Sequence, residues 1–555
     1  MITTDFEERL KLVESKLFSL VPDEYNGTKV IFVSLSDGVS KAKIMKASGE
    51  DWRQCWTDVS ATMRRHVATL KNEIIWIKVD WVTEVMVMEY KKMLSYLDSV
   101  KPNYFKFGIS LDERFKLAFL EQEINANAFI QNDLTQNKSR LAWKNVNEYI
   151  KQNYGLKVLL SDAMVKHVLL FRTNSIFHDG KTCFMLDGNL EGSHRRKLDP
   201  KDPNVLEFII RKASGYLAAQ IKEDGQYHYG HFPRFDKSID HYNILRHAST
   251  TYSLTEAYEL FRDPALLPPI EKALEHLVKD AIISIPLDNG ITAAFVIEKS
   301  MENEIKLGAN AAAILSLAKF SSVCKSSKYD TLMEELANGV VFMQRDDGGF
   351  VHVLNSQDLS VKETSRIIYY DGEAVFALLR LYHLNGNPLL LAAANRAFRY
   401  FINEDYWKHH DHWLSYASYE FYRAKPETEI LAFNLKNAEG ILDFSINRET
   451  TYPTLLELLL AATNLIDYAK KTGNEDELIT SFDLRKMDQA VSKRVEHQLN
   501  GFMFPEIAMY FKSPQKILWS FFIRHHSFRV RIDDVEHNLS GYCSFYQMML
   551  GNTVL

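Results

Sequence analysis

The sequence predicts two domains, an N-terminal domain of mixed α and β structure and an all-helical domain built as a closed ring of helical hairpins. Three observations support this prediction. Strand-like and helix-like segments alternate over the first 200 residues, strand-like runs then nearly disappear, and six strongly apolar helical segments recur up to the C-terminus. With 555 residues, 46% of them hydrophobic, the chain can form more than one buried core.

Residues 1–200 are predicted to form the α/β (α+β) domain. Short runs rich in β-branched and aromatic residues are typical of strands: KVIFVSLS, EIIWIKVDWV and YFKFGISL. Segments between them, such as EDWRQCWTDVSATMRRHVATL, carry apolar residues at helical spacing. The charged, proline-bearing stretch EGSHRRKLDPKDP is expected to end this domain. Its role is open, and binding of a partner protein is one hypothesis.

Residues 203–555 are predicted to be helical, with two kinds of segment in alternation. Segments with one charged face, such as VLEFIIRKASGYLAAQI and DTLMEELANGVVFMQ, can meet water on one side. The other kind begins with polar or aromatic residues and is then apolar almost all round, so it must be buried on several sides. Its six members are HYNILRHASTTYSLTEAYEL, GANAAAILSLAKF, DGEAVFALLRLYHL, DHWLSYASYEFY, YPTLLELLLAATNLI and DDVEHNLSGYCSFYQMML.

A short motif follows three of the outer-type segments: QIKEDGQY, QRDDGGF and QLNGFMF. Each has a Gln, a polar stretch, a Gly able to take the positive φ that ends a helix, and an aromatic residue. This motif between alternating inner and outer helices resembles the repeat of the α/α-toroid superfamily, which includes six-hairpin glycosidases, sugar epimerases, polysaccharide lyases, terpenoid cyclases and lanthionine cyclases. The resemblance implies an (α/α)6 toroid for residues 203–555 and assigns no reaction by itself.

Several chemistries lack their sequence marks. The chain has neither the Cys/Cys-His set of the lanthionine-cyclase zinc site nor the Asp-x-Asp-Asp of protonating terpenoid cyclases, since RIDDVEH holds just an adjacent Asp pair. Glycine-rich phosphate loops are also missing, so we expect no cofactor. The four cysteines are far apart in sequence and indicate neither a disulfide framework nor a thiolate metal site.

Charge and hydropathy limit the partners. The net charge is −6 and the basic residues are scattered, which argues against nucleic acid or anionic lipid as a partner. The N-terminal stretch is amphipathic and acidic rather than signal-like, and no uninterrupted apolar run has the length of a membrane span. We therefore predict a cytoplasmic protein without a membrane span.

Polar residues at the starts of the inner helices are expected to meet in one funnel, because parallel inner helices bring their N-termini to the same end of the ring. The predicted catalytic residues are Asp371, Glu373, Glu457, Asp533 and His537. The predicted substrate-binding residues are Tyr227, Tyr229, His231, His241, Asn243, Arg246, Tyr370, Asp411, His412, Trp413, Tyr452, Arg529, Arg531 and Asp534. No metal ligands are assigned.

Each of these choices has a structural alternative. Asp371 and Asp411 can be ordinary helix caps. Glu373 and Glu457 lie in apolar helices, where an unpaired carboxylate costs several kcal/mol, so each either has a buried partner such as Arg246 or Arg380 or faces the funnel. Asp533 and His537 are one helical turn apart and suit a general-base pair, a metal site or a salt bridge. The aromatic residues can stack on sugar rings or fill the core.

Arg246 in an inner helix needs a carboxylate from the protein or the ligand, and its fork suits a uronate, a phosphate or a peptide carboxylate. The leading hypothesis is a carbohydrate-active enzyme that acts on a glycan or sugar acid by acid–base chemistry, through hydrolysis or epimerisation. The first alternative is an enzyme that epimerises or cyclises a peptide, with the N-terminal domain as a recognition domain. The second alternative is a non-catalytic scaffold that binds a partner protein.

Overall fold

The chain folds into two compact units in this computed structural model. The first unit comprises Met1–Leu198, His231–Ser238 and Asn500–Val530, and the second comprises the remaining residues. The sequence predicted a single boundary near residue 200, whereas two short segments of the later range, 231–238 and 500–530, fold with the first unit. The structure describes residues 4–22, 27–133, 138–157, 159–186, 188, 194–288, 290–473 and 477–551.

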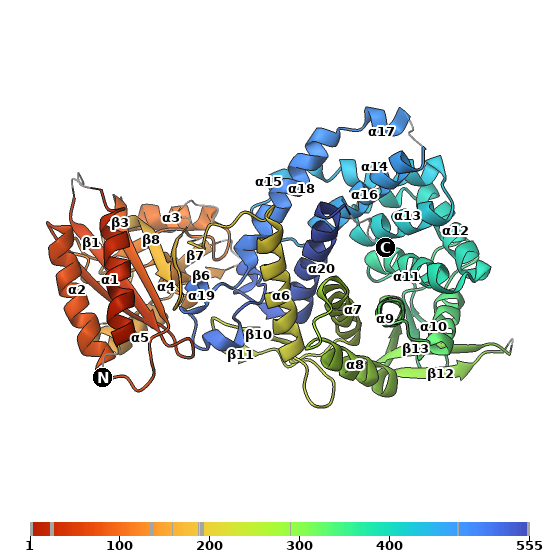
Figure 1. The fold of residues 1–555 in the computed structure, drawn as a ribbon, viewed down its shortest axis with the longest axis horizontal. Helices are drawn as coiled ribbons and strands as arrows, with labels where there is room; N and C mark the ends of the chain where they lie inside the picture. The colour runs from red at the N-terminus through yellow and green to blue at the C-terminus, as the bar shows by residue number, and fades with distance from the viewer. Residues whose placement is uncertain are drawn as a thin grey trace. The chain divides into compact units, whose positions relative to one another are not determined.

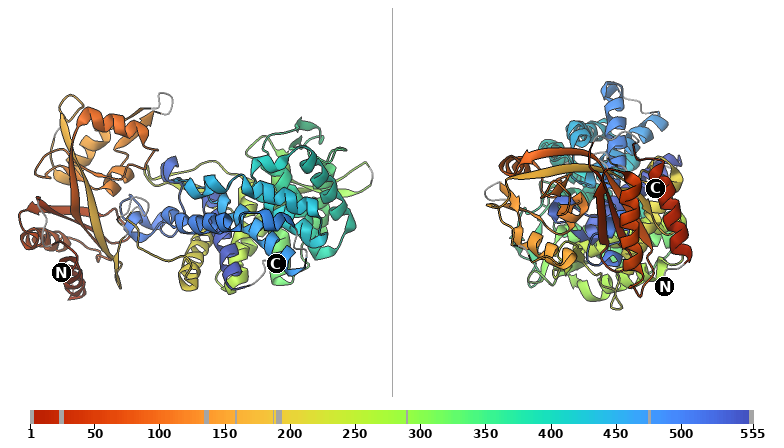
Figure 2. Two further views of the ribbon diagram at one scale, coloured as in Figure 1. Left: turned by 90° about the horizontal axis from the view of Figure 1, so that it is seen from above. Right: turned by 90° about the vertical axis from the view of Figure 1, so that its left-hand side faces the viewer.

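The first unit is built on an antiparallel sheet, whose long orange and yellow-orange strands lie side by side in Figure 2. The strand order is β2-β1-β3-β8-β4-β5, and β9 also pairs with β8. Because its described pairings are antiparallel, the unit is of the α+β type. The strands are β1 (Lys29–Ser36), β2 (Lys43–Gly49), β3 (Trp76–Glu89), β4 (Gly108–Ser110), β5 (Ala118–Phe119), β8 (His167–His178) and β9 (Cys183–Met185).

Helices cover this sheet and bury its apolar side chains. In α2, Asp51 caps the N-terminus by accepting from the backbone N–H of Gln54. Trp52, Trp56 and Met63 then recur on one face and pack with strands β1 and β3 in one core cluster. The helices of this unit are α1 (Thr4–Phe18), α2 (Trp52–Val67), α3 (Tyr90–Ser99), α4 (Glu121–Ala126), α5 (Trp143–Tyr154) and the short α19 (Pro505–Ala508). A separate hairpin is formed by β6 (Ile130–Asp133) and β7 (Lys138–Leu141).

The segment Asn500–Val530 joins the first unit through buried polar contacts. The hydroxyls of Tyr510 and Ser34 lie 2.9 Å apart. The carboxylate of Glu506 accepts two bonds from the Arg196 guanidinium, at 3.0 and 2.9 Å. This segment also carries short 3-10 turns, η4 (Pro514–Lys516) and η5 (Arg524–His526), while β10 (Gly230–Phe232) pairs with β11 (Lys237–Ser238) elsewhere in the chain.

The second unit is a ring of helical hairpins (Figure 1). In the described part of the chain, each inner helix packs against the next and α20 packs against α7, so six helices close the ring and confirm the predicted toroid. The inner helices are α7 (Ile244–Phe261), α9 (Leu307–Cys324), α11 (Tyr369–Asn385), α13 (His412–Ala424), α16 (Thr454–Lys471) and α20 (Ile532–Met549). The outer helices are α6 (Pro203–Ala219), α8 (Leu267–His276), α10 (Asp330–Phe342), α12 (Pro388–Asn403), α14 (Thr428–Glu439) and α18 (Leu484–Gln498).

The inner helices are the strongly apolar segments of the sequence. α9 is long and apolar enough to span a membrane by length and composition, yet 89% of it is buried inside the fold. Its position in the inner layer of helices explains that composition, because neighbouring helices surround it on several sides. Shorter elements complete the connections: η1 (Leu277–Ala281), η2 (Tyr406–His409), α15 (Leu442–Asn447), α17 (Glu477–Ser481), η3 (Leu499–Gly501) and β17 (Val530–Arg531).

An antiparallel sheet of five strands lies in the connections around α9 and α10, which corrects the expectation that strands nearly disappear after residue 205. Six of the seven residues of β13 are buried, and the strand packs against α10. A strand that is buried in this way has a continuous apolar run, which the sequence pattern does not separate from a buried helix. The strands are β12 (Ile282–Pro286), β13 (Thr292–Glu298), β14 (Glu304–Lys306), β15 (Val353–Asn355) and β16 (Val361–Glu363).

Two of the three repeated motifs fold alike. Gly225 and Gly348 have φ values of +84° and +96°, and each closes a tight turn after an outer helix. A Cβ atom on either glycine would lie 2.4–2.5 Å from a backbone oxygen of the next outer helix, on Lys272 or Arg396. The third motif differs, because it ends in the 3-10 turn Leu499–Gly501.

Gly348→Ala is expected to lower the free energy of unfolding by about 2 to 4 kcal/mol, since it combines a left-handed backbone with a clash against Arg396. Gly386→Ala is the matched control: Gly386 has φ +69° but no atom within 4 Å of the added Cβ. That change should cost about 1 kcal/mol. Urea unfolding of the full chain measures both, and equal losses would contradict the close-approach explanation.

Candidate active site

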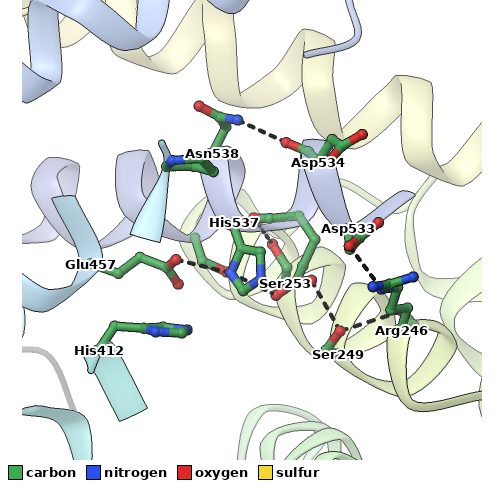
Figure 3. Close-up of polar contacts among 12 residues, drawn as sticks. Arg246, Ser249, Ser253, His412, Glu457, Asp533, Asp534, His537 and Asn538 are labelled. Carbon is green, nitrogen blue, oxygen red and sulfur yellow. Dashed lines mark hydrogen bonds and ion pairs between the residues drawn. The ribbon is translucent and has the colours of Figure 1, made fainter. Parts of the chain in front are cut away.

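Polar side chains from the first two turns of several inner helices meet at one end of the ring (Figure 3). α20 contributes Asp533 and His537, α7 contributes Arg246, α16 contributes Glu457 and α13 contributes His412. Because these side chains contact one another, the helices direct their N-termini to the same end. The unpaired backbone N–H groups there add partial positive charge to the site.

His537 is the central charged group. Its Nδ1 lies 2.9 Å from a carboxylate oxygen of Glu457 and 3.5 Å from one of Glu536, while 21% of its side chain stays exposed. Burial disfavours the imidazolium, but the charges of Glu536 and Glu457 outweigh it and raise the pKa of His537 to about 10. His537 therefore carries a proton at neutral pH.

Glu536 is its buried neighbour on α20. Burial, helped by the charges of Glu457 and Asp533 and opposed by His537, raises the pKa of Glu536 to about 8. The hydroxyl of Ser249 on α7 donates to its carboxylate at 3.0 Å. A buried carboxyl group that titrates near neutral pH is suited to proton transfer.

His412 on α13 is the second histidine of the site, and its ring centroid lies 5.4 Å from that of His537. Its Nδ1 lies 3.1 Å from a carboxylate oxygen of Asp411, which favours the tautomer with the proton on Nδ1. Its Nε2 is buried and has no hydrogen-bond partner among the described residues. Asp411 also caps α13 by accepting from the N–H of Trp413 at 3.0 Å. Asp411 therefore both caps α13 and orients the imidazole of His412, the first residue of that helix.

Asp533 is held between two arginines rather than paired with His537. Arg246 approaches one carboxylate oxygen at 2.9 Å, and Arg531 donates to both oxygens. Burial opposes ionisation of this group, but the two guanidinium charges hold the pKa of Asp533 below its usual range. The hydroxyl of Tyr229 accepts from Arg246 at 2.6 Å. Asp533 is therefore a fixed negative charge.

Glu373 is buried on α11 and lacks the predicted protein partners. Arg246 is paired with Asp533, and Arg380 donates to Glu420 at 2.8 Å. The Oε1 atom of Glu373 is buried without a hydrogen-bond partner among the described residues. Burial, together with the charges of Glu536 and Asp411, raises the pKa of Glu373 well above its usual value. The sequence left open whether Glu373 has a buried partner, and the structure places neither proposed arginine beside it.

Asp371 lies two residues before Glu373 on α11 but makes a different contact. Its Oδ2 atom accepts a hydrogen bond from Nε2 of His352 at 2.7 Å. The other ring nitrogen of His352 accepts from the backbone N–H of Arg366 at 2.8 Å. This buried pair holds the chain before α11, and among the described residues no hydrogen bond or ion pair joins Asp371 to His537 or His412.

Several predicted substrate contacts lie beside the cluster. Trp413 is buried with its ring 4.7 Å from that of His412. Tyr452 is 39% exposed, and burial together with this neighbour raises the pKa of Tyr369. Asp534 is buried and lies 3.7 Å from Arg531.

Other predicted contacts have structural surroundings. The buried hydroxyl of Tyr227 bonds that of Thr251 at 3.0 Å. Asn243 caps α7, and His241 is exposed with its ring 6.0 Å from that of Tyr229. The remaining predicted residues are Tyr370, which is buried against His352, and His231 and Arg529, which lie in the first unit.

Sequence reasoning missed Glu536, Ser249 and Tyr416. Tyr416 lies one turn after His412 and donates to Glu457 at 3.4 Å. Helical spacing could have found all three, since Ser249 follows Arg246 by three residues, Glu536 follows Asp533 by three, and Tyr416 follows His412 by four.

His412, Glu457 and His537 could also hold a metal ion. One ligand atom from each lies within 4.8 Å of the other two. Two imidazoles and one carboxylate suit a first-row divalent cation. Such a cation would compete with the proton on His537. The sequence offered a metal site as one alternative for Asp533 and His537 and assigned no metal ligand.

No protein-family model matches the chain, and no curated protein matches it by sequence. Three solved structures are similar to it over 62% of this chain. They are D-mannose isomerase (TM-score 0.45, 11% identity, 98% of that chain), cellobiose 2-epimerase from Bacillus thermoamylovorans (0.46, 10%, 100%) and an α-1,6-mannanase from Salegentibacter sp. (0.43, 9%, 99%). These likenesses concern the fold alone.

Proposed function

We propose that the ring is a carbohydrate-active enzyme that epimerises a reducing sugar by acid–base chemistry. The observation that carries this proposal is the pair of imidazoles of His412 and His537. They come from different inner helices, and their ring centroids lie 5.4 Å apart. One is protonated next to two carboxylates, and the other has a buried Nε2 without a partner among the described residues. An acid and a base are thus present together before any substrate binds.

Epimerisation next to an aldehyde needs this combination. In the open-chain sugar, Nε2 of His412 removes the proton from C2. The electron pair of that C–H bond forms the C1=C2 double bond, and the carbonyl oxygen becomes the negatively charged oxygen of an enediolate. His537 then delivers a proton to C2 from the opposite face and the carbonyl re-forms, so that atoms and charge balance and C2 is inverted. In the reverse direction the two histidines exchange roles. Arg246 and Arg531, fixed by Asp533, supply donors that stabilise negative charge developing on the oxygen.

The surroundings of the pair suit a sugar. Tyr369 and Tyr452 are 38% and 39% exposed, and the Tyr369 ring lies 6.1 Å from that of His412. Exposed tyrosine rings beside polar groups offer a stacking face for a pyranose and hydrogen bonds for its hydroxyls. These features support a sugar more than an apolar substrate.

Deuterium incorporation tests the proposal. The full chain is incubated in D2O with glucose, mannose, N-acetylglucosamine and cellobiose, and proton NMR follows the C2 hydrogen and the appearance of the C2 epimer. We expect loss of the C2 proton signal together with epimer formation for at least one sugar. Absence of exchange with every sugar in the panel would overturn the proposal.

Hydrolysis is the second candidate, and one observation favours it. Asp533 is held ionised, whereas the pKa values of Glu536 and Glu373 are raised, a division typical of a glycosidase acid and its partner carboxylate. Both oxygens of Asp533, however, are occupied by arginines. Release of new reducing ends from oligosaccharides without C2 deuteration would select hydrolysis over epimerisation.

A further inference from the structure

The first unit contains a pocket of about 670 Å³ that the ring chemistry does not use. Its walls come from the loop after α3, from hairpin β6–β7, from the start of α5, and from residues 234–235 and 525–527. The volume is in the range of small-molecule sites. The lining is mixed, with side chains of both polar and aromatic character.

Arg234 is the distinctive residue of this pocket. Its guanidinium donates to the Asn103 side chain at 2.5 Å and to the backbone oxygen of Ile130 at 3.4 Å. It forms no ion pair with any of the described residues, and its Nε is buried without a hydrogen-bond partner among them. Burial lowers the pKa of Arg234 to about 10, with no neighbouring carboxylate to oppose it. An arginine that is largely buried without a counter-charge is costly unless a ligand supplies the anion.

Most of the charged side chains around Arg234 are basic as well. Arg140 and Lys144 also line the pocket, and the one carboxylate among the described lining residues is Asp162. Its Oδ1 atom already accepts from the Tyr90 hydroxyl and from the Trp143 indole at 2.6 Å. The pocket is therefore locally positive in a chain whose net charge is −6.

The other lining residues indicate what kind of molecule, beyond its anionic group, fits the pocket. Trp143 is fixed by its bond to Asp162, and Phe235 is 60% exposed, so an aromatic face is available. Side-chain amides of Asn132 and Asn145 add neutral hydrogen-bonding groups. Amides beside an indole ring suit a hydroxylated ring of hexose size.

We propose that this pocket binds a sugar acid or a sugar phosphate, and that Arg234 receives its carboxylate or phosphate group. The shared chemistry is an oxyanion on a hexose-sized polar body. Arginine suits both oxyanions, because its planar fork can donate two parallel bonds to either. This inference does not depend on the function proposed for the ring.

Calorimetric titration of the full chain with glucose 6-phosphate, glucuronate and neutral glucose tests the inference. At least one anionic sugar should bind at least tenfold more tightly than glucose, and the tighter of the two identifies phosphate or carboxylate as the natural group. Equal binding of glucose, or binding of neither anion up to about 10 mM, would refute the proposal.

Three variants locate the binding. Arg234→Gln should weaken the anion by tenfold or more, Lys144→Gln should weaken it severalfold, and Arg65→Gln, an exposed residue on α2, should change nothing. Lys144 is exposed at the pocket rim, so its variant stays informative if Arg234→Gln folds poorly. Unchanged affinity in both pocket variants would overturn the assignment. His412→Asn should keep anion binding, which separates this inference from the ring proposal.

Discussion

His412→Asn is expected to lower kcat for epimerisation by about 10²- to 10⁴-fold with little change in KM, because it removes a positioned proton acceptor and few substrate contacts. Asparagine can keep a donor near Asp411, which preserves the start of α13. His383→Asn is the matched control: its imidazole is partly exposed in the same ring and bonds the backbone oxygen of Glu420 at 3.0 Å. That variant should retain activity within about threefold.

The same pair offers a sharper test through isotope exchange. If His412 and His537 serve opposite faces of C2, each single Asn variant stops epimerisation but still exchanges the C2 proton of one epimer with solvent. His412→Asn and His537→Asn should then spare opposite epimers. Loss of exchange from both epimers in both variants would indicate one shared base, and full activity of either variant would remove the pair from the mechanism.

The ring could be predicted from sequence because its inner helices are unusual. A segment such as residues 307–324 is buried on nearly every side, so its composition reports its position directly. Outer helices α8 and α14 were not identified, although α8 has a clear apolar face. Its first turn contains two adjacent prolines, a pattern that is also typical of loops.

The excursion of residues 500–530 into the first unit could not be predicted. Its apolar residues look like those of any core segment, and no local pattern tells which core they join. The contacts that assign it are single long-range pairs, such as Tyr510 with Ser34 and Glu506 with Arg196. Sequence periodicity carries information about faces of elements and not about such partners.

The candidate site shows the same limit. The residues that cluster at the ring mouth were recognisable as polar groups in apolar helices, which is a local property. Which of these residues pair with one another could not be recognised. Arg246 forms an ion pair with Asp533, and Glu457 forms one with His537, across intervals of 287 and 80 residues. The partner of Asp371 could not be predicted either, because His352, which binds it, lies on a different segment.

Glu373→Gln is expected to raise the free energy of unfolding and to lower the enzymatic activity. The carboxyl group is 2% exposed, and its pKa is raised well above 4.5, chiefly by burial. The folded state therefore holds its proton more tightly than the unfolded state. Below pH 4.5 the group is protonated in both states, and its ionisation does not affect the free energy of unfolding. As pH rises above 4.5 the unfolded state releases its proton first, so stability falls progressively until the folded group also ionises. Glutamine removes this loss.

Calorimetry at pH 5 and pH 8 should show a gain for Glu373→Gln that is small at pH 5 and about 1 to 3 kcal/mol at pH 8. Glu457→Gln is the matched control on another inner helix, α16: Glu457 is equally buried but paired with His537, so its change should destabilise the ring. Activity of Glu373→Gln should fall about 10- to 100-fold, because a carboxyl group kept at a cost to stability is retained for the substrate. A variant that is both more stable and fully active would show that Glu373 has no part in the reaction.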